Sequence, residues 1–447
     1  MKPVIAIVGR ANVGKSTLFN RLAGKQVAIV EDLPGTTRDR VFSTAMLEDT
    51  PVTLVDTGGL GFLQETAGLE DKVRKQVDAA IKEADVIIFM VDVRDGLISA
   101  DREIADQLRK SRKPVVMAAN KADNLSLENA TGDFYQLGLG NPVPISAHHN
   151  RGIGYLTDAL MPLLPASPPE TPDTGIPRLA IVGRPNVGKS MLLNALVGEE
   201  RVIVDSTAGT TRDAVDTDMD FEGQKVTLID TAGIRRRGKS GTGIEYYSLI
   251  RSLRAIDNAD IALLVVDATE FITAQDTHIA GYIKQAYKGS IVVVNKCDLI
   301  STEKKDEIET YVNGRLKFMS QIPVLFISAK FGTGVKKIIP VAMDIYRERH
   351  KQLANSVVDK LIKGAVEART PPSKGLRRLE VVRAYQDGVN PPSFFMLVND
   401  PELVHFSYQR YLENKLRHTF GFYGTSIRLS FKQAPKRRFH KTGESKS

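Results

Sequence analysis

Gly9-Arg10-Ala11-Asn12-Val13-Gly14-Lys15-Ser16 decides the fold, and the chain repeats it as Gly183-Arg184-Pro185-Asn186-Val187-Gly188-Lys189-Ser190. Both stretches fit Gly-x-x-x-x-Gly-Lys-[Ser/Thr], the pattern of a loop that wraps nucleotide phosphates. Each follows a short apolar run, Val4 to Val8 or Leu179 to Val182, and precedes a helical pattern. One such match can be a chance glycine turn, but two matches in the expected strand–loop–helix context exclude that explanation.

The chemistry of these two loops predicts phosphate and Mg²⁺ binding. Their glycines let backbone N–H groups turn inward, and the helix that follows adds the positive end of its dipole. We expect Lys15 and Lys189 to reach the β- and γ-phosphates, which makes them catalytic as well as binding residues. Ser16 and Ser190 are expected to ligate Mg²⁺, and all eight residues of each loop are predicted to bind nucleotide.

Four further motifs recur in the same order and at nearly the same spacing. Gly35-Thr36-Thr37-Arg38-Asp39 returns as Gly209-Thr210-Thr211-Arg212-Asp213, and Asp56-Thr57-Gly58-Gly59 returns as Asp230-Thr231-Ala232-Gly233, both in register with the two phosphate loops. Asn120-Lys121-Ala122-Asp123 returns one position later than that register, as Asn295-Lys296-Cys297-Asp298, and Ser146-Ala147 returns a few positions later still, as Ser328-Ala329. The chain therefore contains a duplicated domain, and not a short-period repeat.

Apolar, β-rich runs alternate with helical stretches in both copies. Continuous apolar runs suit strands that are covered on both faces, and strand–helix alternation predicts an α/β fold with an open, mostly parallel sheet. Ligands then bind at the carboxyl ends of the strands, where every repeated motif falls. The predicted strands include Val52–Val55, Val86–Val91, Val115–Ala118 and Val143–Ile145 in the first copy, and Val226–Ile229, Ile261–Val266, Ile291–Val294 and Val324–Ile327 in the second.

The second and third motifs are predicted to sense the γ-phosphate. The hydroxyls of Thr37 and Thr211 can complete the coordination of Mg²⁺ only while a γ-phosphate is present, so both are predicted metal ligands and catalytic residues. Asp56 and Asp230 end apolar strands and are expected to hold Mg²⁺ directly or through water. The rest of each motif, namely Thr57, Gly58 and Gly59 with Thr231, Ala232 and Gly233, is predicted to bind nucleotide, the glycines by bringing a backbone N–H to the γ-phosphate.

The fourth motif, Asn-Lys-x-Asp, predicts guanine as the base. The carboxylates of Asp123 and Asp298 can accept two hydrogen bonds from guanine N1–H and the N2 amine, whereas adenine lacks the amine and presents a lone pair at N1. Lys121 and Lys296 can lay their alkyl stems along the base. The motif residues Asn120, Ala122, Asn295 and Cys297 complete the predicted site, with the N–H groups of Ala147 and Ala329 as candidate donors to guanine O6.

The residue that follows each Asp-x-x-Gly motif is Leu60 or Ile234, where Ras-like enzymes have a glutamine that orients the attacking water. Asn12 and Asn186 offer a substitute, because their amide oxygens can help to bind a monovalent cation that stabilises the developing charge. We therefore name them as catalytic candidates. A purely structural role in the turn of the loop is equally consistent with the sequence.

The second copy departs from the first in two places. Met191 replaces Thr17, which removes a hydroxyl near the α-phosphate and keeps the backbone N–H. The basic stretch Arg235-Arg236-Arg237-Gly238-Lys239 follows its Asp-x-x-Gly motif. This stretch is either a contact for RNA or a neighbouring domain, or a solvated loop.

Positive charge is concentrated at the C-terminal end. Residues 351–447 carry 18 Lys and Arg against 8 Asp and Glu, a net charge of +10 in a chain whose total is +8. This excess points to a polyanionic partner, although a solvated surface with a disordered tail gives the same balance. The sequence has no apolar run long enough to cross a membrane and has a single cysteine, Cys297, so we expect no membrane insertion, no signal peptide and a cytoplasmic location.

The remaining sequence predicts a small α+β unit after the second copy. A helical pattern runs from about Val335 to Ala368, and Pro371-Pro372 stops it. The pattern then predicts strands Arg377–Tyr385 and Phe394–Val398, a helix Phe406–Phe420 and a strand Ser426–Phe431. We expect domains at 1–164, 177–350 and 351–432, with a Pro-rich linker at 165–176 and a disordered basic tail at 433–447.

Together these motifs resemble the Der (EngA) GTPases, which have two P-loop GTPase (Ras-like) domains in tandem and a C-terminal KH-like domain. The stretch from Pro391-Pro392-Ser393-Phe394-Phe395 to Leu403, with Tyr408 and Arg410-Tyr411-Leu412-Glu413-Asn414, is similar to that third domain. The resemblance implies GTP hydrolysis with Mg²⁺, stimulation by K⁺ with Asn12 and Asn186 at the ligand positions, and binding to rRNA of the 50S subunit during its assembly. We expect a monomer that binds no DNA.

KH domains normally clamp RNA with a Gly-x-x-Gly loop between two helices. Gly421-Phe422-Tyr423-Gly424 has these letters but falls between a predicted helix and a predicted strand, so we interpret it as a turn. The sheet and its basic rim are then left to dock on rRNA or on the second G domain. A nucleotide-sensing scaffold with little hydrolysis and a tRNA-modifying G protein are the competing hypotheses, and a P-loop kinase is disfavoured because no acceptor-binding insertion is evident.

Overall fold

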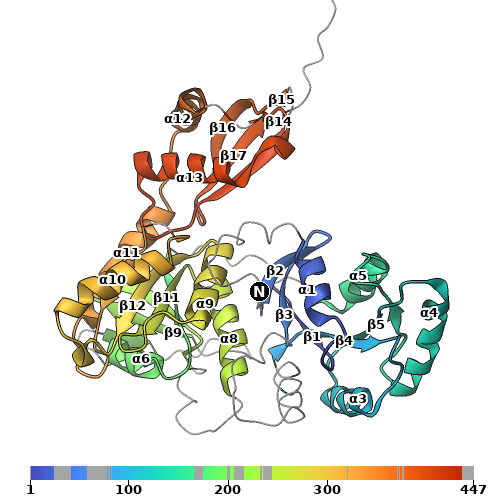
Figure 1. Ribbon diagram of the computed structural model, residues 1–447. Coiled ribbons are helices and arrows are strands. Elements are labelled where there is room, and N and C mark those ends of the chain that lie inside the picture. Colours follow the sequence, from blue (N-terminus) through green and yellow to red (C-terminus); the bar gives the residue numbers. More distant parts are fainter. Residues whose placement is uncertain are drawn as a thin grey trace, which may run out of the picture.

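The computed structural model describes residues 2–24, 42–57, 78, 81, 83–165, 175–198, 202–205, 216–231, 234, 244–319, 321–369, 371, 373–374 and 377–434. Predictions for Thr37, Thr211, Gly58, Gly59, Leu60, Ala232 and Gly233, for residues 235–239 and for most of the linker and the tail lie outside these residues, although Gln433, predicted to begin the disordered tail, is the last residue of a strand. Figure 1 shows the first G domain beside the second, with the C-terminal domain beyond the second.

The first G domain is built on a six-stranded sheet in the order β2-β3-β1-β4-β5-β6. All neighbours are parallel except β2 and β3, and every residue of β1 and β4 is buried, as their unbroken apolar sequences predict. The elements are β1 (Val4–Val8), α1 (Lys15–Ala23), β2 (Phe42–Leu47), β3 (Thr50–Asp56), β4 (Val86–Asp92), α3 (Ser99–Ser111), β5 (Val115–Asn120), α4 (Leu125–Asn129), η3 (Ala130–Leu137), β6 (Val143–Pro144), α5 (Ile153–Leu160) and η4 (Met161–Leu163).

The second G domain repeats this order as β13-β12-β11-β7-β10-β9-β8, with β8 as an additional edge strand. The predicted duplication and the mostly parallel sheets are therefore confirmed. The elements are β7 (Arg178–Val182), α6 (Lys189–Val197), β8 (Val202–Asp205), β9 (Thr217–Phe221), β10 (Gln224–Ile229), α8 (Ile244–Asn258), β11 (Ile261–Asp267), α9 (Ala274–Gln285), β12 (Gly289–Asn295), η6 (Cys297–Leu299), α10 (Glu303–Arg315), β13 (Val324–Phe326), η7 (Val335–Lys337) and α11 (Ile338–Arg349).

The C-terminal domain has a three-stranded sheet, β16-β17-β18, with α12 and α13 packed on one face. Phe394, Met396 and Val398 point from β17 toward these helices and are buried with Leu412 and Leu416. The elements are α12 (Asn355–Ala368), β14 (Ser373–Lys374), β15 (Arg377–Arg378), β16 (Val381–Gly388), β17 (Ser393–Val398), η8 (Pro401–Leu403), α13 (Phe406–Phe420) and β18 (Arg428–Gln433).

Two predictions of secondary structure are wrong. The helical pattern over 335–368 is not one helix, because the chain leaves the α-helical conformation between α11 and α12, where Lys351 donates to the Phe420 carbonyl and the Leu353 N–H donates to Gln386. The strand predicted over 377–385 is divided between β15, which pairs with β14, and β16, which pairs with β17. In both places tertiary hydrogen bonds override a continuous local pattern. Among the described residues, no helix is both long and apolar enough to span a membrane.

The two G domains meet through α8 and α9 of the second and the β1–β3 side of the first. The Tyr282 hydroxyl lies 3.0 Å from the Thr53 hydroxyl and donates to Asp257, which also accepts a hydrogen bond from Lys2 at 3.1 Å. Phe42 packs edge-on against the Tyr282 ring. Because Tyr282 is fully buried, this junction is a continuation of the protein core and not a loose surface contact.

The second G domain and the C-terminal domain meet around Arg349, the last residue of α11, whose side chain is buried. Its guanidinium donates to Asn390 Oδ1 at 3.0 and 2.5 Å, to the Tyr287 carbonyl at 2.9 Å and to the Thr425 hydroxyl at 2.8 Å. Burial lowers the pKa of Arg349 to about 10, so the side chain stays charged at neutral pH. One fully desolvated cation therefore joins α11 to the turns before β17 and β18.

We expect Arg349→Met to reduce the free energy of unfolding by about 3 kcal/mol, because it leaves several buried acceptors without a donor. Urea denaturation followed by circular dichroism measures this change. The matched control is Arg347→Met, which removes an exposed arginine of the same helix that bonds to Asp344 and the Met343 carbonyl, and should change stability by less than about 0.5 kcal/mol. Equal effects of the two substitutions would contradict the proposed role of Arg349.

Candidate nucleotide-binding sites

Each phosphate loop has glycine at two positions where its backbone passes so close to neighbouring atoms that no side chain would fit. Gly14 has φ 98°, and a Cβ there would collide with the Asn120 amide nitrogen, while a Cβ at Gly9 would collide with the Met90 carbonyl oxygen. Gly188 and Gly183 stand in the same positions against Asn295 and the Val265 carbonyl. The glycines of the motif therefore allow the loop to lie directly on the ends of two neighbouring strands.

The phosphate-loop lysines fold back over their own loops. Lys15 Nζ donates to the carbonyls of Gly9 at 2.8 Å and Arg10 at 2.6 Å, and Lys189 makes the equivalent bonds to Gly183 and Arg184. Burial lowers the pKa of Lys15, and the nearby Asp56 carboxylate opposes that shift. A desolvated ammonium that donates to backbone carbonyl oxygens is well suited to exchange these partners for phosphate oxygens.

The predicted Mg²⁺ ligands come together in the first domain. The Ser16 hydroxyl donates to the Asp56 carboxylate at 2.6 Å, which places two hard oxygen donors side by side at the end of β3. In the second domain the Ser190 hydroxyl donates to the Ile234 carbonyl at 2.9 Å. The hydroxyl of Thr57 donates to the Ile7 carbonyl at 2.8 Å, so this side chain ties β3 to β1.

Asn120 and Asn295 connect the phosphate loop to the loop that follows the next strand. Asn120 Nδ2 donates to the Val13 carbonyl at 2.7 Å, and its Oδ1 accepts the Ala147 N–H at 3.0 Å. Asn295 repeats both bonds, to Val187 at 2.8 Å and from Ala329 at 2.9 Å. The Ala147 and Ala329 N–H groups, which we expected at guanine O6, thus serve here to fix the loop on the asparagine.

The carboxylates predicted to read guanine are held by serines of that same loop. The Ser146 hydroxyl donates to Asp123 at 2.6 Å and the Ser328 hydroxyl donates to Asp298 at 2.5 Å. The Ser146 hydrogen bond and the Arg94 guanidinium hold the pKa of Asp123 below its usual range. The ionised acceptor that guanine N1–H and N2 require is therefore present at neutral pH.

Asn12 and Asn186 adopt the left-handed conformation, with φ of 62° and 65°. Asparagine tolerates this conformation better than most residues, so the backbone geometry alone accounts for an asparagine in the loop. The amide oxygen remains compatible with a cation beside the phosphates, and both interpretations of these residues stay open.

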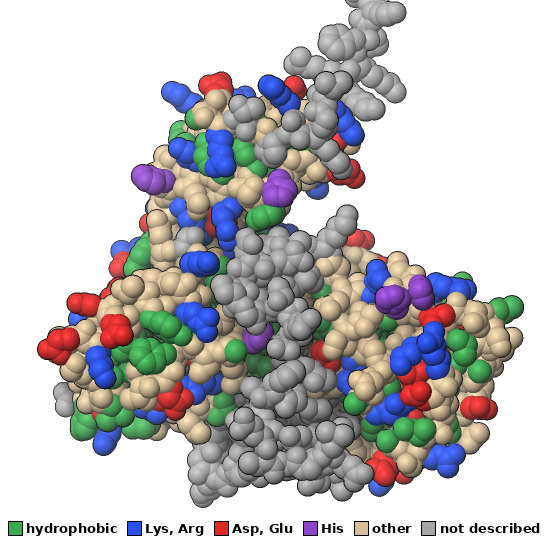
Figure 2. Space-filling view, viewed as in Figure 1, with side chains coloured by type: hydrophobic (Ala, Val, Ile, Leu, Met, Phe, Trp, Pro, Cys, Tyr) green, Lys and Arg blue, Asp and Glu red, His purple; other side chains and the backbone are tan. Residues whose placement is uncertain are grey.

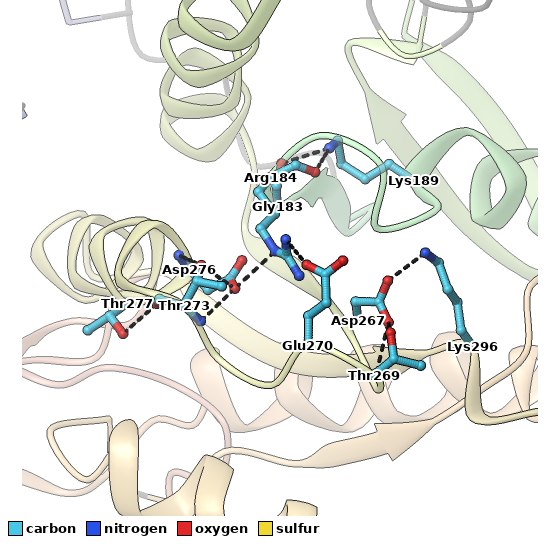
Figure 3. A network of polar contacts seen from close by, with 10 residues as sticks. All are labelled: Gly183, Arg184, Lys189, Asp267, Thr269, Glu270, Thr273, Asp276, Thr277 and Lys296. Atoms are coloured by element: carbon cyan, nitrogen blue, oxygen red, sulfur yellow. Dashed lines mark hydrogen bonds and ion pairs between the residues drawn. The ribbon is translucent and has the colours of Figure 1, made fainter. Parts of the chain in front are cut away.

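The sequence analysis did not identify the acidic residues that pair with the lysine of the Asn-Lys-x-Asp motif and with the arginine of the phosphate loop. Lys121 pairs with Asp92 and Lys296 pairs with Asp267 at 2.5 Å. In Figure 3 the Arg184 side chain points between Glu270 and Asp276, while Lys189 points back to the Gly183 and Arg184 backbone. The signal was available, because Asp-x-x-[Asp/Glu]-x-x-x-x-x-Asp begins at Asp92 and again at Asp267, in register with the two Asn-Lys-x-Asp motifs.

Known protein families match both halves of the chain that contain these sites. The model of a family described as 50S ribosome-binding GTPase matches residues 4–121 and again 178–296. A model described as the KH-domain-like C-terminal region of EngA bacterial GTPase enzymes matches residues 352–432. The chain is 48% identical over 432 residues to the GTPase Der of Desulforamulus reducens, covering 96% of this chain and 97% of that protein.

The chain belongs to the Der family of GTPases. Two further Der proteins support the assignment. That of Desulfitobacterium hafniense is 47% identical, covering 98% of this chain and 99% of the relative, and that of Chloroflexus aggregans is 48% identical, covering 96% and 98%. The predicted family, the tandem P-loop GTPase domains with a KH-like domain, and the GTPase activity are confirmed. Members of the Der family hydrolyse GTP, so the chemistry of this chain is phosphoryl transfer to water.

We expect Asp123→Asn to exchange guanine for xanthine at the first site, because an amide can donate to the 2-oxo group that xanthine has in place of the guanine amine. Binding stoichiometry measures this directly. The wild-type chain should bind two GDP, and the variant one GDP and one XDP, with GDP affinity at the first site reduced by about a hundredfold or more.

Asp133→Asn, an exposed substitution on η3, is the matched control and should still bind two GDP. If Asp123→Asn also binds two GDP with wild-type affinity, Asp123 does not read the base.

Proposed function

We propose that this GTPase acts in the cytoplasm, as a monomer, in the assembly of the 50S ribosomal subunit, and that its two nucleotide sites control how its domains are arranged on rRNA. The predicted site residues, including Thr37 and Thr211, and the domain boundaries given above are part of this proposal. The family described as 50S ribosome-binding supports the choice of partner.

The domain junctions support control by nucleotide. Phe42, which packs on Tyr282 of the second domain, directly follows residues 25–41, the stretch that contains Thr37. From the other side, Arg251 and Arg254 of α8 bond to Glu83 and Asp85 of the first domain, and α8 is the first long helix after Asp230. The first side of the junction therefore directly follows a segment proposed to sense the γ-phosphate, and the second side is on a helix that begins at Ile244, after the proposed sensing motif at Asp230.

The outer face of the KH-like sheet carries the proposed contact with rRNA. Strand register places Arg383, Leu397 and Lys432 in one row across β16, β17 and β18, and Tyr385, Phe395 and Ser430 in the next. The Tyr385 and Phe395 rings lie 5.2 Å apart, and Lys432 Nζ lies 5.4 Å from the Phe395 centroid. Aromatic rings flanked by cations offer stacking for unpaired bases and charge for the phosphates.

The Gly421–Gly424 stretch does not form an RNA clamp in this arrangement. The turn lies between α13 and β18, the Phe422 side chain is buried, and the Gly424 carbonyl accepts the Ser290 N–H at 2.8 Å. This stretch therefore docks the domain on the second G domain, as the interpretation as a turn allows, and the sheet face is left for RNA. Figure 2 shows acidic and basic side chains side by side on the visible faces of both G domains, consistent with placing the basic excess in the C-terminal part.

At each nucleotide site we propose that Lys15 or Lys189 moves from its carbonyl partners to the phosphates. Mg²⁺, when bound by Ser16 and Asp56 or by Ser190 and Asp230, would neutralise part of the charge that develops on the transferred phosphoryl group. Asn12 and Asn186 would help to hold K⁺ beside the phosphates, at a separate position, by their amide oxygens. The bound cations would then supply the positive charge that an arginine finger gives in other GTPases.

We expect the rate of GTP hydrolysis to be at least about tenfold higher in KCl than in NaCl. Losing one electrostatic stabiliser of the transition state typically costs at least this much. Paired Asn12→Gly and Asn186→Gly should abolish this difference. Glycine tolerates the left-handed backbone and removes only the amide, so it separates cation binding from loop conformation. Equal rates of the wild-type chain in the two salts would reject the proposed K⁺ site.

We expect the double variant Arg383→Glu with Lys432→Glu to bind large-subunit ribosomal particles at least about tenfold more weakly. The slope of the logarithm of the binding constant against the logarithm of the salt concentration should fall by about two, because each phosphate contact contributes about 0.9. The charge-matched control is paired Lys360→Glu and Lys415→Glu, at exposed positions of α12 and α13, the helices on the opposite face. Similar losses for the two pairs would reject the sheet face as the docking surface.

A further inference from the structure

Three carboxylates recur with the same spacing in both G domains and have no assigned role. They are Asp92, Asp95 and Asp101 in the first copy, and Asp267, Glu270 and Asp276 in the second. In each copy the first ends a central strand, β4 or β11, and the third lies in the first turn of the next helix, α3 or α9. They occupy one short connection at the carboxyl end of the sheet, beside the nucleotide site.

The second and third carboxylates of each set hold the arginine of the phosphate loop. Arg10 lies 2.5 Å from the Asp95 carboxylate and 3.6 Å from that of Asp101. Arg184 pairs with Glu270 and lies 3.4 Å from Asp276. The side chains of Asp101 and Asp276 are wholly buried, whereas those of Asp95 and Glu270 are about half exposed. The same arrangement in two domains of different sequence indicates a requirement of the site and not an accident of one surface.

Each of these arginines also supports the catalytic lysine. The Arg10 backbone carbonyl accepts the Lys15 ammonium, and the Arg184 carbonyl accepts that of Lys189. A displacement of the arginine side chain thus moves a residue that is hydrogen-bonded to the phosphate-binding lysine. The first carboxylate of each set pairs with the base-motif lysine, Lys121 or Lys296. One connection therefore holds both the phosphate end and the base end of the site.

We propose that Asp101 and Asp276 are positioning residues that act through Arg10 and Arg184 to set the phosphate loop relative to the base motif, and so determine the guanine-nucleotide affinity of each domain. This inference rests on the proposed location of the nucleotide sites. A nucleotide would contact both the phosphate loop and the base motif. It would therefore bind most tightly when the distance between these two segments is fixed before binding.

A helix cap alone does not explain the two aspartates. Asp101 accepts the Ile98 N–H at 3.4 Å, and Asp276 accepts the Thr273 N–H at 3.0 Å, as capping residues do. A neutral asparagine also provides an acceptor, without the penalty of burying a charge. Burial raises the pKa of both carboxyls, and the phosphate-loop arginine is among the groups that favour the charged form. A neutral asparagine could keep the cap hydrogen bond, but it could not form an ion pair with the phosphate-loop arginine.

The test is a double-mutant cycle in the full-length chain. One variant carries Asp101→Asn and Asp276→Asn, which keep the cap acceptors, a second carries Arg10→Gln and Arg184→Gln, and a third carries all four changes. We expect each pair of changes to weaken binding of fluorescent GDP by about tenfold, the scale of one charge-assisted interaction, and to raise KM with kcat nearly unchanged. The four changes together should weaken binding no more than about twofold beyond either pair, because the residues act as one unit.

The matched control is Asp106→Asn with Asp344→Asn, two exposed aspartates that each pair with an arginine three residues on. GDP affinity of the aspartate variant within twofold of this control, or losses that multiply in the four-change variant, would overturn the inference. Should the buried changes prevent folding, Asp95→Asn with Glu270→Gln alters the exposed partners, and unchanged affinity there would also overturn it. Failure of the proposed function appears instead in the wild-type chain, as absent binding to ribosomal particles.

Discussion

In each G domain one asparagine side chain joins two loops that would otherwise be independent. The Asn120 amide donates to the phosphate loop at Val13 and accepts from the base loop at Ala147, and it lies so close to Gly14 that any side chain there would collide with it. The left-handed conformation of Gly14 and the position of the buried Asn120 amide therefore depend on each other. Lys15 and Ser16 stand on the first of these loops and Ser146, which donates to Asp123, stands on the second, so the placement of all four depends on the Asn120 amide.

The second G domain is the structural centre of the molecule. Its α8 and α9 contact the first domain, and the end of α11 with the turn before β12 contacts the KH-like domain. Between the two junctions lies Lys288, which donates to the Asp257 carbonyl, and whose burial lowers its pKa to about 8. Buried charges such as Lys288 and Arg349 require specific partners, so they favour one relative placement of the domains more selectively than apolar contacts would.

Duplication preserved the hydrogen bonds among the repeated motifs and changed some of the residues around them. Asn120 and Asn295 make the same two bonds, and Asp123 and Asp298 are each held by a serine. The hydroxyl of Ser16 donates to Asp56, whereas that of Ser190 donates to the carbonyl of Ile234, the residue just before the basic stretch 235–239. The two domains therefore share the hydrogen bonds around Asn120 and Asn295 and differ in the partner of the phosphate-loop serine.

The sequence by itself determined the two G domains, their mostly parallel sheets and the motifs at the ends of the strands, because phosphate and guanine recognition fix short, local patterns of glycine, lysine and aspartate. The helix Phe406–Phe420 was predicted with its observed bounds for a similar reason, since its apolar period is local. Tertiary structure alone decided the break between α11 and α12, the burial of Arg349 between two domains, and the docking of the Gly421–Gly424 turn on the second domain. Those features depend on partners that are distant along the chain, and a long-range ion pair or buried hydrogen bond leaves no periodic trace in the residues that form it.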